Sequence, residues 1–181
     1  MKKFLLVTIF LFFNFFQVIS SATVIHAGLL INGESSVPSQ EMSIVIEGSK
    51  IQSIETGYIT PDTEDEFIDL SGYTVLPGLM DMHVHLSSEY SKNSYQERIS
   101  LNAGDYAIRA VSNAEKTLMA GFTSVRNLGD RGGVSISLRN AIEKGIVVGP
   151  RIFSSGTTIA SSGGHGAVSY THLTLPTIYS V

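Results

Sequence analysis

The strongest constraint on the fold is a regular succession of strand-like and helix-like segments that follows Pro77 and Gly78. The strand-like segments are short apolar or alternating runs, and glycines end both helix-like patterns. A strand, helix, strand, helix and strand are expected, in this order, at residues 79–86, 107–118, 122–128, 134–144 and 151–155. The apolar positions that mark the two helices are Ala107, Val111, Ala114 and Leu118 in the first, and Ile136, Ala141 and Ile142 in the second. This succession predicts parallel βα units with right-handed crossovers.

The predicted units are too few to close a barrel. A (β/α)₈ barrel needs roughly 250 residues, whereas only three strands are expected within residues 78–167. We therefore expect this α/β segment to be the front portion of something larger.

Residues 23–77 show a different pattern, in which short alternating runs are separated by glycines. Such runs predict strands joined by turns. We expect a small antiparallel sheet here, with no chemistry of its own.

The first 22 residues resemble an export signal. Lys2 and Lys3 precede a largely apolar stretch at residues 4–19, and Ser20 and Ala22 supply small residues for cleavage. The alternative is a membrane anchor, but the stretch is shorter than the roughly 20 apolar residues of a spanning helix. We expect a signal peptide at residues 1–22 and an exported protein, periplasmic or secreted, without a stable membrane anchor.

Composition excludes several classes of function. With 43% hydrophobic and 15% charged residues among its 181, the chain is globular rather than disordered. Its formal net charge of −4 offers no basic surface for nucleic acid. It contains no cysteine, which excludes a disulfide framework, a thiol nucleophile and a cysteine zinc cage.

Residues 75–86, VLPGLMDMHVHL, place ionisable side chains at every second position of a strand. Asp81, His83 and His85 are therefore expected on one face, opposite Met82 and its apolar partners. Two imidazoles on one face, near the carboxyl end of the strand, can reach a single metal ion. The alternative is a polar pair on an exposed strand, but the apolar opposite face and the following βα repeat favour a metal.

Three segments resemble the amidohydrolase superfamily of metal-dependent hydrolases. LPGLMDMHVHL (76–86) looks like the signature of its first barrel strand. GFTSVRNLGD (121–130) and GPRIFSSGTTIASSGGHG (149–166) are similar to the next two strand segments of the imidazolonepropionase-like and prolidase-like branch. The resemblance covers residues 23–167.

This resemblance implies a distorted (β/α)₈ TIM-like barrel, incomplete in this chain, preceded by a small β-sandwich domain. Residues 23–77 would form the N-terminal part of the sandwich, and residues 78–167 the first three βα units. His83 and His85 would be ligands of one ion in a centre of one or two divalent ions, most simply Zn²⁺. His165 would contact substrate at the barrel mouth, or be a loop histidine without a role.

Other residues take supporting roles by the same resemblance. Asp81 would support the strand interior, and Asn127 stands where relatives often carry aspartate. Arg126 and Asp130 are expected to pair locally, and His26 to be structural.

The remaining catalytic groups of the superfamily come from later strands, so they are expected beyond residue 181 and the chain alone should be inactive. Residues 168–181 depart from the family pattern and resemble a translated sequencing-adapter tail, which we expect to be non-native. The alternative is a genuine short strand. His172 is accordingly not counted as a ligand.

The leading functional hypothesis is an enzyme that hydrolyses C–N bonds of small substrates, such as dipeptides or N-acyl amino acids, by metal-activated hydroxide. The alternatives are a cyclic-amide hydrolase resembling imidazolonepropionase and a non-catalytic exported β-domain protein. The expected partner is a small amide or peptide, and a homo-oligomer of the full-length protein is compatible with the sequence.

Overall fold

The computed structural model describes residues 21–158, 160–161 and 172–173, and the chain divides between Pro77 and Gly78 into two compact units. Most of residues 1–22, His165 and most of residues 168–181 lie outside the described residues, so the signal peptide, the substrate contact and the non-native tail remain predictions. Within the described part of the chain, no helix is long and apolar enough to cross a membrane.

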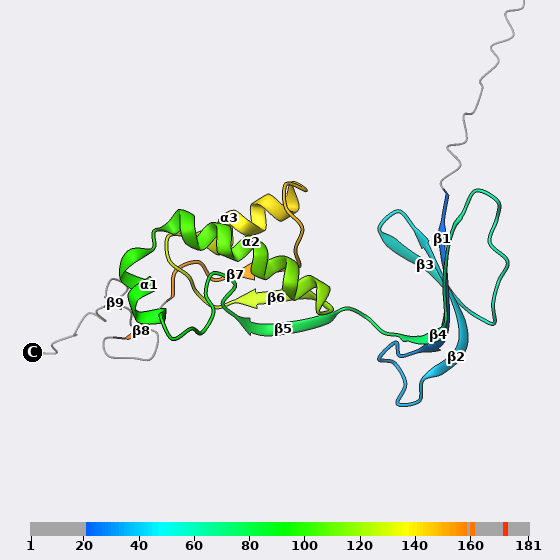
Figure 1. Cartoon of the computed structure of the whole chain (residues 1–181). Coiled ribbons are helices and arrows are strands. Elements are labelled where there is room, and N and C mark those ends of the chain that lie inside the picture. The colour runs from blue at the N-terminus through cyan, green and yellow to red at the C-terminus, as the bar shows by residue number, and fades with distance from the viewer. Residues whose placement is uncertain (1–20, 159, 162–171, 174–181) are drawn as a thin grey trace, which may run out of the picture. The chain divides into compact units, whose positions relative to one another are not determined.

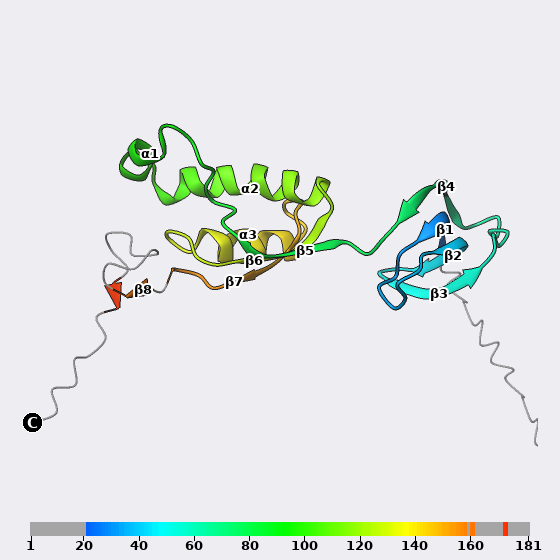
Figure 2. The same ribbon diagram turned by 90° about the horizontal axis from the view of Figure 1, so that it is seen from below.

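The first unit is a four-stranded sheet (Figure 1), and Figure 2 shows its strands in the order β3-β2-β1-β4. Its strands are β1 (Thr23–Leu30), β2 (Ser39–Glu47), β3 (Lys50–Thr56) and β4 (Glu66–Val75). A tight turn joins β2 to β3 at Gly48, whose φ of 59° suits glycine. Whether this sheet belongs to a sandwich stays a prediction.

The expectation of a purely antiparallel sheet is wrong at β4. The pairs β1–β2 and β2–β3 are antiparallel, but β4 runs parallel to β1. The amide of Ala22 donates to Oδ1 of Asp65 at 2.9 Å, and the amide of Glu66 donates to the carbonyl of Ala22 at 2.9 Å. These contacts join the starts of β1 and β4 at the same end of the sheet, which strand alternation by itself cannot specify.

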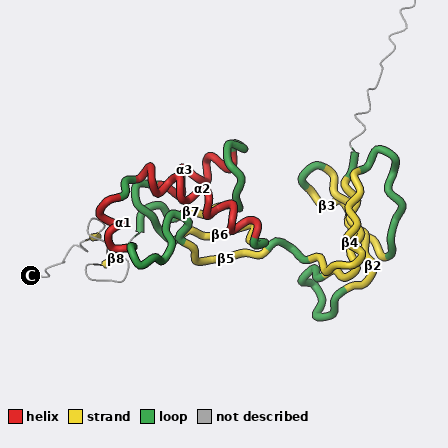
Figure 3. The backbone as a smooth tube through the Cα atoms, viewed as in Figure 1, coloured by secondary structure: helices red, strands yellow, loops and turns green. Residues whose placement is uncertain are grey.

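The second unit is α/β, as expected. Its main elements are β5 (Leu79–Val84), α1 (Ser94–Ser100), α2 (Ala103–Met119), β6 (Phe122–Asn127), α3 (Val134–Glu143) and β7 (Arg151–Ser154). The three strands are parallel in the order β5-β6-β7. Figure 3 shows the alternation of strand and helix along the tube. Two-residue strands β8 (Ala160–Ser161) and β9 (His172–Leu173) form a separate parallel pair.

Helices α2 and α3 pack on one side of this sheet (Figure 2). The buried core consists of Leu86, Tyr106, Ala110, Ala114, Val125, Val134, Leu138 and Ile152. On α2 the buried stripe is shifted from the predicted positions, with Ala107 and Val111 only partly buried. The small side chain of Ala110, 0% exposed, allows close packing against the strands.

The burial predicted for α3 is partly wrong. Leu138 and Val134 lie in the core, Ile142 packs against it, and Ile136 is 38% exposed. Position 136 falls on the opposite side of the helix from 134 and 138, because two residues correspond to about 200° of rotation.

Candidate metal and substrate site

A cavity of about 780 Å³ lies where the carboxyl ends of β5 and β6 meet α1 and the start of α2. Its walls include the following side chains and backbone segments: His83, His85, residues 87–90, Ser94, Glu97, Arg98, Tyr106, Arg109, residues 129–132 and residues 157–158. Parallel βα units place functional groups at the carboxyl ends of their strands, because the loops that follow the strands gather there.

His83 and His85 lie side by side at the end of β5. Their ring centroids are 5.4 Å apart, with an angle of 68° between the ring planes. Both side chains line the cavity. The structure therefore brings together the two predicted metal ligands, and their binding of a metal stays a prediction.

Asp81, the third ionisable residue of this strand, does not line the cavity with the two histidines. In the register of β5 and β6, Asp81 pairs with Val125 and Val84 with Asn127, so β5 contains one extra residue between these pairs. This irregularity interrupts the strict alternation expected from Asp81 to Leu86. Oδ1 of Asp81 accepts the His83 amide at 2.9 Å, which is a contact within the strand.

The ring of His85 is held by a backbone carbonyl. Its Nδ1 lies 3.1 Å from the carbonyl oxygen of Gly129. Because a carbonyl oxygen can only accept, this contact requires Nδ1–H and leaves the Nε2 lone pair available in the neutral ring. Metal-binding histidines are oriented by such a contact at the other ring nitrogen.

The donor chemistry of this pair suits a divalent ion, but the ligand set is incomplete within the described residues. A catalytic zinc ion takes three protein ligands and keeps an open position. Among residues 21–158, 160–161 and 172–173, no group of three or more histidine or acidic side chains is placed to hold a metal. His83 and His85 can therefore supply two ligands of such a centre.

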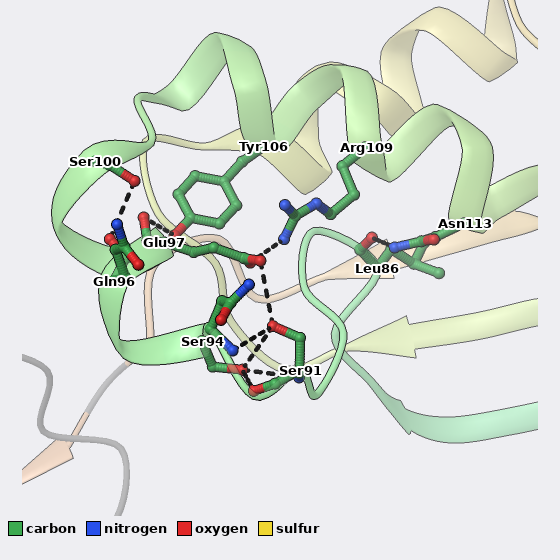
Figure 4. Close-up of polar contacts among 10 residues, drawn as sticks. Leu86, Ser91, Ser94, Gln96, Glu97, Ser100, Tyr106, Arg109 and Asn113 are labelled. Carbon is green, nitrogen blue, oxygen red and sulfur yellow. Dashed lines mark hydrogen bonds and ion pairs between the residues drawn. The ribbon is translucent and has the colours of Figure 1, made fainter.

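Two buried asparagines hold the backbone immediately after His85. The amide of Leu86 donates to Oδ1 of Asn127 at 2.9 Å. Nδ2 of Asn113 donates to the carbonyl of Leu86 at 2.9 Å, a contact drawn in Figure 4. Asn127 is 0% exposed and Asn113 is 8% exposed. Sequence reasoning noticed Asn127 only as a departure from aspartate and missed Asn113, although an amide among the apolar positions of a helix is a recognisable signal.

A second polar network lies on the α1 side of the cavity. Nη1 of Arg109 on α2 donates to Oε2 of Glu97 on α1 at 2.7 Å, and the Ser91 hydroxyl donates to Oε1 of Glu97 at 3.2 Å (Figure 4). The hydroxyl of Tyr106 donates to the backbone carbonyl of Glu97 at 3.3 Å. This network ties α1 and the loop before it to α2.

The ion pair changes the acidity of both partners. The hydrogen bond from Arg109 lowers the pKa of the Glu97 carboxyl below its ordinary value, and the Ser91 hydroxyl adds to this effect. The same hydrogen bond raises the pKa of the Arg109 guanidinium. Both groups therefore remain charged at neutral pH. Sequence reasoning did not identify either residue, because the pair joins two helices whose packing has no local pattern.

The predicted pairing of Arg126 with Asp130 is wrong. Nε of Arg126 donates to the carbonyl of Met82 at 2.8 Å. The carboxylate of Asp130 instead accepts the amides of Val134 and Ser135, each at 2.9 Å, and the Ser135 hydroxyl. The amides at the start of α3 have no hydrogen-bond partner inside the helix, so they donate to the Asp130 carboxylate. The positive end of the helix dipole also attracts this negative charge.

An α/β unit with a cavity at the carboxyl ends of its parallel strands is typical of barrel enzymes. Residues 74–176 match the model of the Amidohydrolase family. The chain therefore belongs to the amidohydrolase family. The matched range overlaps residues 168–176 of the segment predicted to be non-native, and that prediction stays open.

Known proteins of this family resemble the chain. It is 49% identical to a crystallised Xaa-Pro dipeptidase with bound methionine in its active site, with a TM-score of 0.76, covering 81% of this chain and 36% of that one. It is 34% identical to a prolidase complexed with N-methylphosphonate-L-proline, with a TM-score of 0.69, covering 80% and 34%. Ochratoxinase from Aspergillus niger is 27% identical over 155 residues, covering 82% of this chain and 31% of the relative.

The chain thus spans about a third of the length of these relatives, since the covered shares are 36%, 34% and 31%. The relatives are similar to this chain in its matched segment. The substrate and the metal content, by contrast, are properties of each whole relative.

Proposed function

We propose that the intact protein is a metal-dependent amidohydrolase that cleaves C–N bonds of small substrates such as dipeptides or N-acyl amino acids. One observation carries this proposal: His83 and His85 lie side by side on the wall of a cavity at the carboxyl ends of the strands. The similarity to an Xaa-Pro dipeptidase, a prolidase and ochratoxinase supports the choice of substrates.

His83 and His85 would hold a divalent ion, most simply zinc. When bound, such an ion supplies Lewis-acid chemistry that activates water and polarises the scissile carbonyl. The chain's own contribution is to orient the ligands: the Gly129 carbonyl holds the Nδ1 proton of His85 and leaves Nε2 for the ion. The cavity, at about 780 Å³, lies in the size range of small-molecule sites.

Two further parts of the proposal concern the whole protein. Two histidines do not complete a catalytic zinc site, so we expect no turnover from the 181-residue chain alone. The basic and apolar pattern of residues 1–22 supports export to a periplasm or to the outside of the cell.

The test uses the product of the intact gene, amplified past codon 168 so that the native sequence replaces residues 168–181. Metal analysis of the parent protein should find one or two divalent ions, and the double variant His83→Ala with His85→Ala should lose both the metal and turnover. His26→Ala is the control, because His26 belongs to the first unit, where it stacks on Tyr58 with ring centroids 4.6 Å apart. Survival of metal and turnover in the double variant would refute the ligand assignment.

A substrate panel then separates the candidate activities. Dipeptides and N-acyl amino acids should be hydrolysed faster than cyclic amides. Preferential opening of a cyclic amide would favour the imidazolonepropionase-like alternative.

A further inference from the structure

Four hydrogen-bonding groups form a closed ring next to the cavity. The carbonyl oxygen of Gly129 accepts two hydrogen bonds, from Nδ1 of His85 at 3.1 Å and from Nδ2 of Asn127 at 3.3 Å. Oδ1 of Asn127 accepts the amide of Leu86 at 2.9 Å, and Leu86 follows His85 in the chain. The ring therefore connects the side chain of His85 to its own backbone through Asn127.

Only a carboxamide can make both contacts of Asn127. Its oxygen accepts from Leu86 while its nitrogen donates to Gly129, and a carboxylate has no donor for the second contact. The side chain is 0% exposed, so water cannot replace a lost partner without entering the core. Asn127 thus fixes the carbonyl that in turn fixes the His85 ring.

Asn113 provides a natural comparison within the same cluster. It donates to the carbonyl of Leu86 at 2.9 Å and is 8% exposed, so it holds the next peptide group, between Leu86 and Ser87. Asn113 lies on α2, whereas Asn127 is the last residue of β6. The hydrogen bond that the Asn113 side chain donates goes to Leu86 and not to Gly129.

We propose that Asn127 is a positioning residue that sets the ring orientation and the Nδ1–H tautomer of His85. Through the Gly129 carbonyl it keeps the proton on Nδ1 and presents the Nε2 lone pair to the cavity. The consequence for metal affinity rests on the proposed function, whereas the consequence for the tautomer does not.

The test compares the parent chain with Asn127→Asp and Asn113→Asp. Both substitutions keep the size of the side chain and put a carboxylate oxygen against a carbonyl, but only the first removes the donor to Gly129. Nitrogen-15 NMR of the histidine rings in mildly alkaline, metal-free buffer reports the tautomer of His85. Titration with Zn²⁺ alone, against a chromophoric chelator, reports affinity.

We expect Nδ1–H in the parent chain and in Asn113→Asp, and a shift toward Nε2–H in Asn127→Asp. Zinc affinity should fall about 10- to 100-fold in Asn127→Asp, the range found when a group that orients a ligand is removed. Asn127→Ser should lose both the Nδ1–H preference and the zinc affinity of the parent, because the shorter side chain cannot span both partners.

Three results would overturn the proposal: Nε2–H as the main tautomer in the parent chain, an unchanged tautomer in Asn127→Asp, or an equal change in Asn113→Asp. The first needs no variant, so a folding failure does not remove the test. A tautomer shift in Asn127→Asp, together with no zinc binding by the parent, would uphold the positioning role and count against the metal proposal.

Discussion

Gly129 combines a backbone conformation and a location that disfavour any side chain. Its φ is 130°, a region that residues with a Cβ rarely adopt, and a Cβ there would lie 2.9 Å from Cα of Thr158. Its carbonyl is also the acceptor for His85. The backbone conformation and the closeness of Thr158 therefore require glycine at the position whose carbonyl orients His85.

Gly129→Ala should lower the free energy of unfolding by about 1–3 kcal/mol through backbone strain, with a further cost from the contact with Thr158. Gly133→Ala is the matched control, because Gly133 also has a positive φ of 72° but nothing within 4 Å of an added Cβ. Urea denaturation of both variants measures the difference. Equal losses in the two variants would show that the contact with Thr158 has no energetic role.

Glu97 gives a pH-dependent prediction. Its pKa is lowered in the folded state by the hydrogen bond from Arg109, so the ionised carboxylate stabilises the fold. This contribution is present above the ordinary pKa of 4.5 and is lost as the pH falls through the lower, folded-state pKa. Glu97→Gln should therefore be less stable than the parent at neutral pH, and the difference should vanish at strongly acidic pH.

Thermal denaturation of the parent and of Glu97→Gln across this pH range checks the prediction. Glu89→Gln is the control, because the Glu89–Lys116 pair is 3.7 Å apart and its side chains are 61% and 65% exposed. Exposed pairs of this kind contribute little. A pH-independent difference for Glu97→Gln would mean that lost packing, rather than lost charge, causes its effect.

Among the elements, α2 has the most complete N-terminus. Oδ1 of Asn102 accepts the amides of Gly104 at 2.7 Å and Asp105 at 3.3 Å, and Oδ2 of Asp105 accepts the amide of Asn102 at 2.9 Å. This reciprocal capping box satisfies amides that have no partner inside the helix. It fixes the start of the helix that carries Arg109 and Asn113 to the site.

Asn102→Ala should cost about 1 kcal/mol of stability, the typical loss for an N-cap. Asn93→Ala is the control, because Asn93 is the N-cap of α1 but its side chain makes no capping hydrogen bond. It should leave the melting temperature nearly unchanged. If the two variants melt alike, the capping box does not stabilise α2.

Most helices and strands of the second unit could be predicted from local sequence patterns alone. Glycine punctuation and apolar periodicity predicted β5, β6, β7, α2 and α3 at their approximate positions. Helix α1 was not predicted as a separate element, because residues 94–100 offer only one apolar pair at helical spacing, Tyr95 and Ile99, and neither is buried.

For the whole chain, apolar side chains on the second unit remain uncovered. Met80, Met82 and Phe153 are 70%, 54% and 58% exposed, and strands β5 and β7 each have a neighbour on one side only in the three-stranded sheet. Open strand edges and exposed apolar surface promote association.

We therefore expect the 181-residue chain to self-associate and to melt with poor cooperativity. Size-exclusion chromatography with light scattering and a thermal melt measure both properties. A soluble monomer with a sharp two-state transition would contradict this expectation. A segment of residues 21–77 alone serves as the comparison, since it belongs to a separate compact unit.

The sequence by itself determined the features that depend on residues close together in the chain. These are the parallel βα units, the closeness of His83 and His85 at the end of one strand, and the family resemblance carried by residues 76–86. Each depends on a spacing of a few residues, because side-chain direction follows the helical or strand period.

Only the tertiary structure decided the contacts that orient the site. The parallel direction of β4 and the asparagines around Leu86 come from distant parts of the chain, with Asn127 meeting Leu86 across 41 positions and Gly129 meeting His85 across 44. Hydrogen bonds across such separations leave no periodic pattern in a sequence, because they form only after the strands have aligned and the helices have covered them.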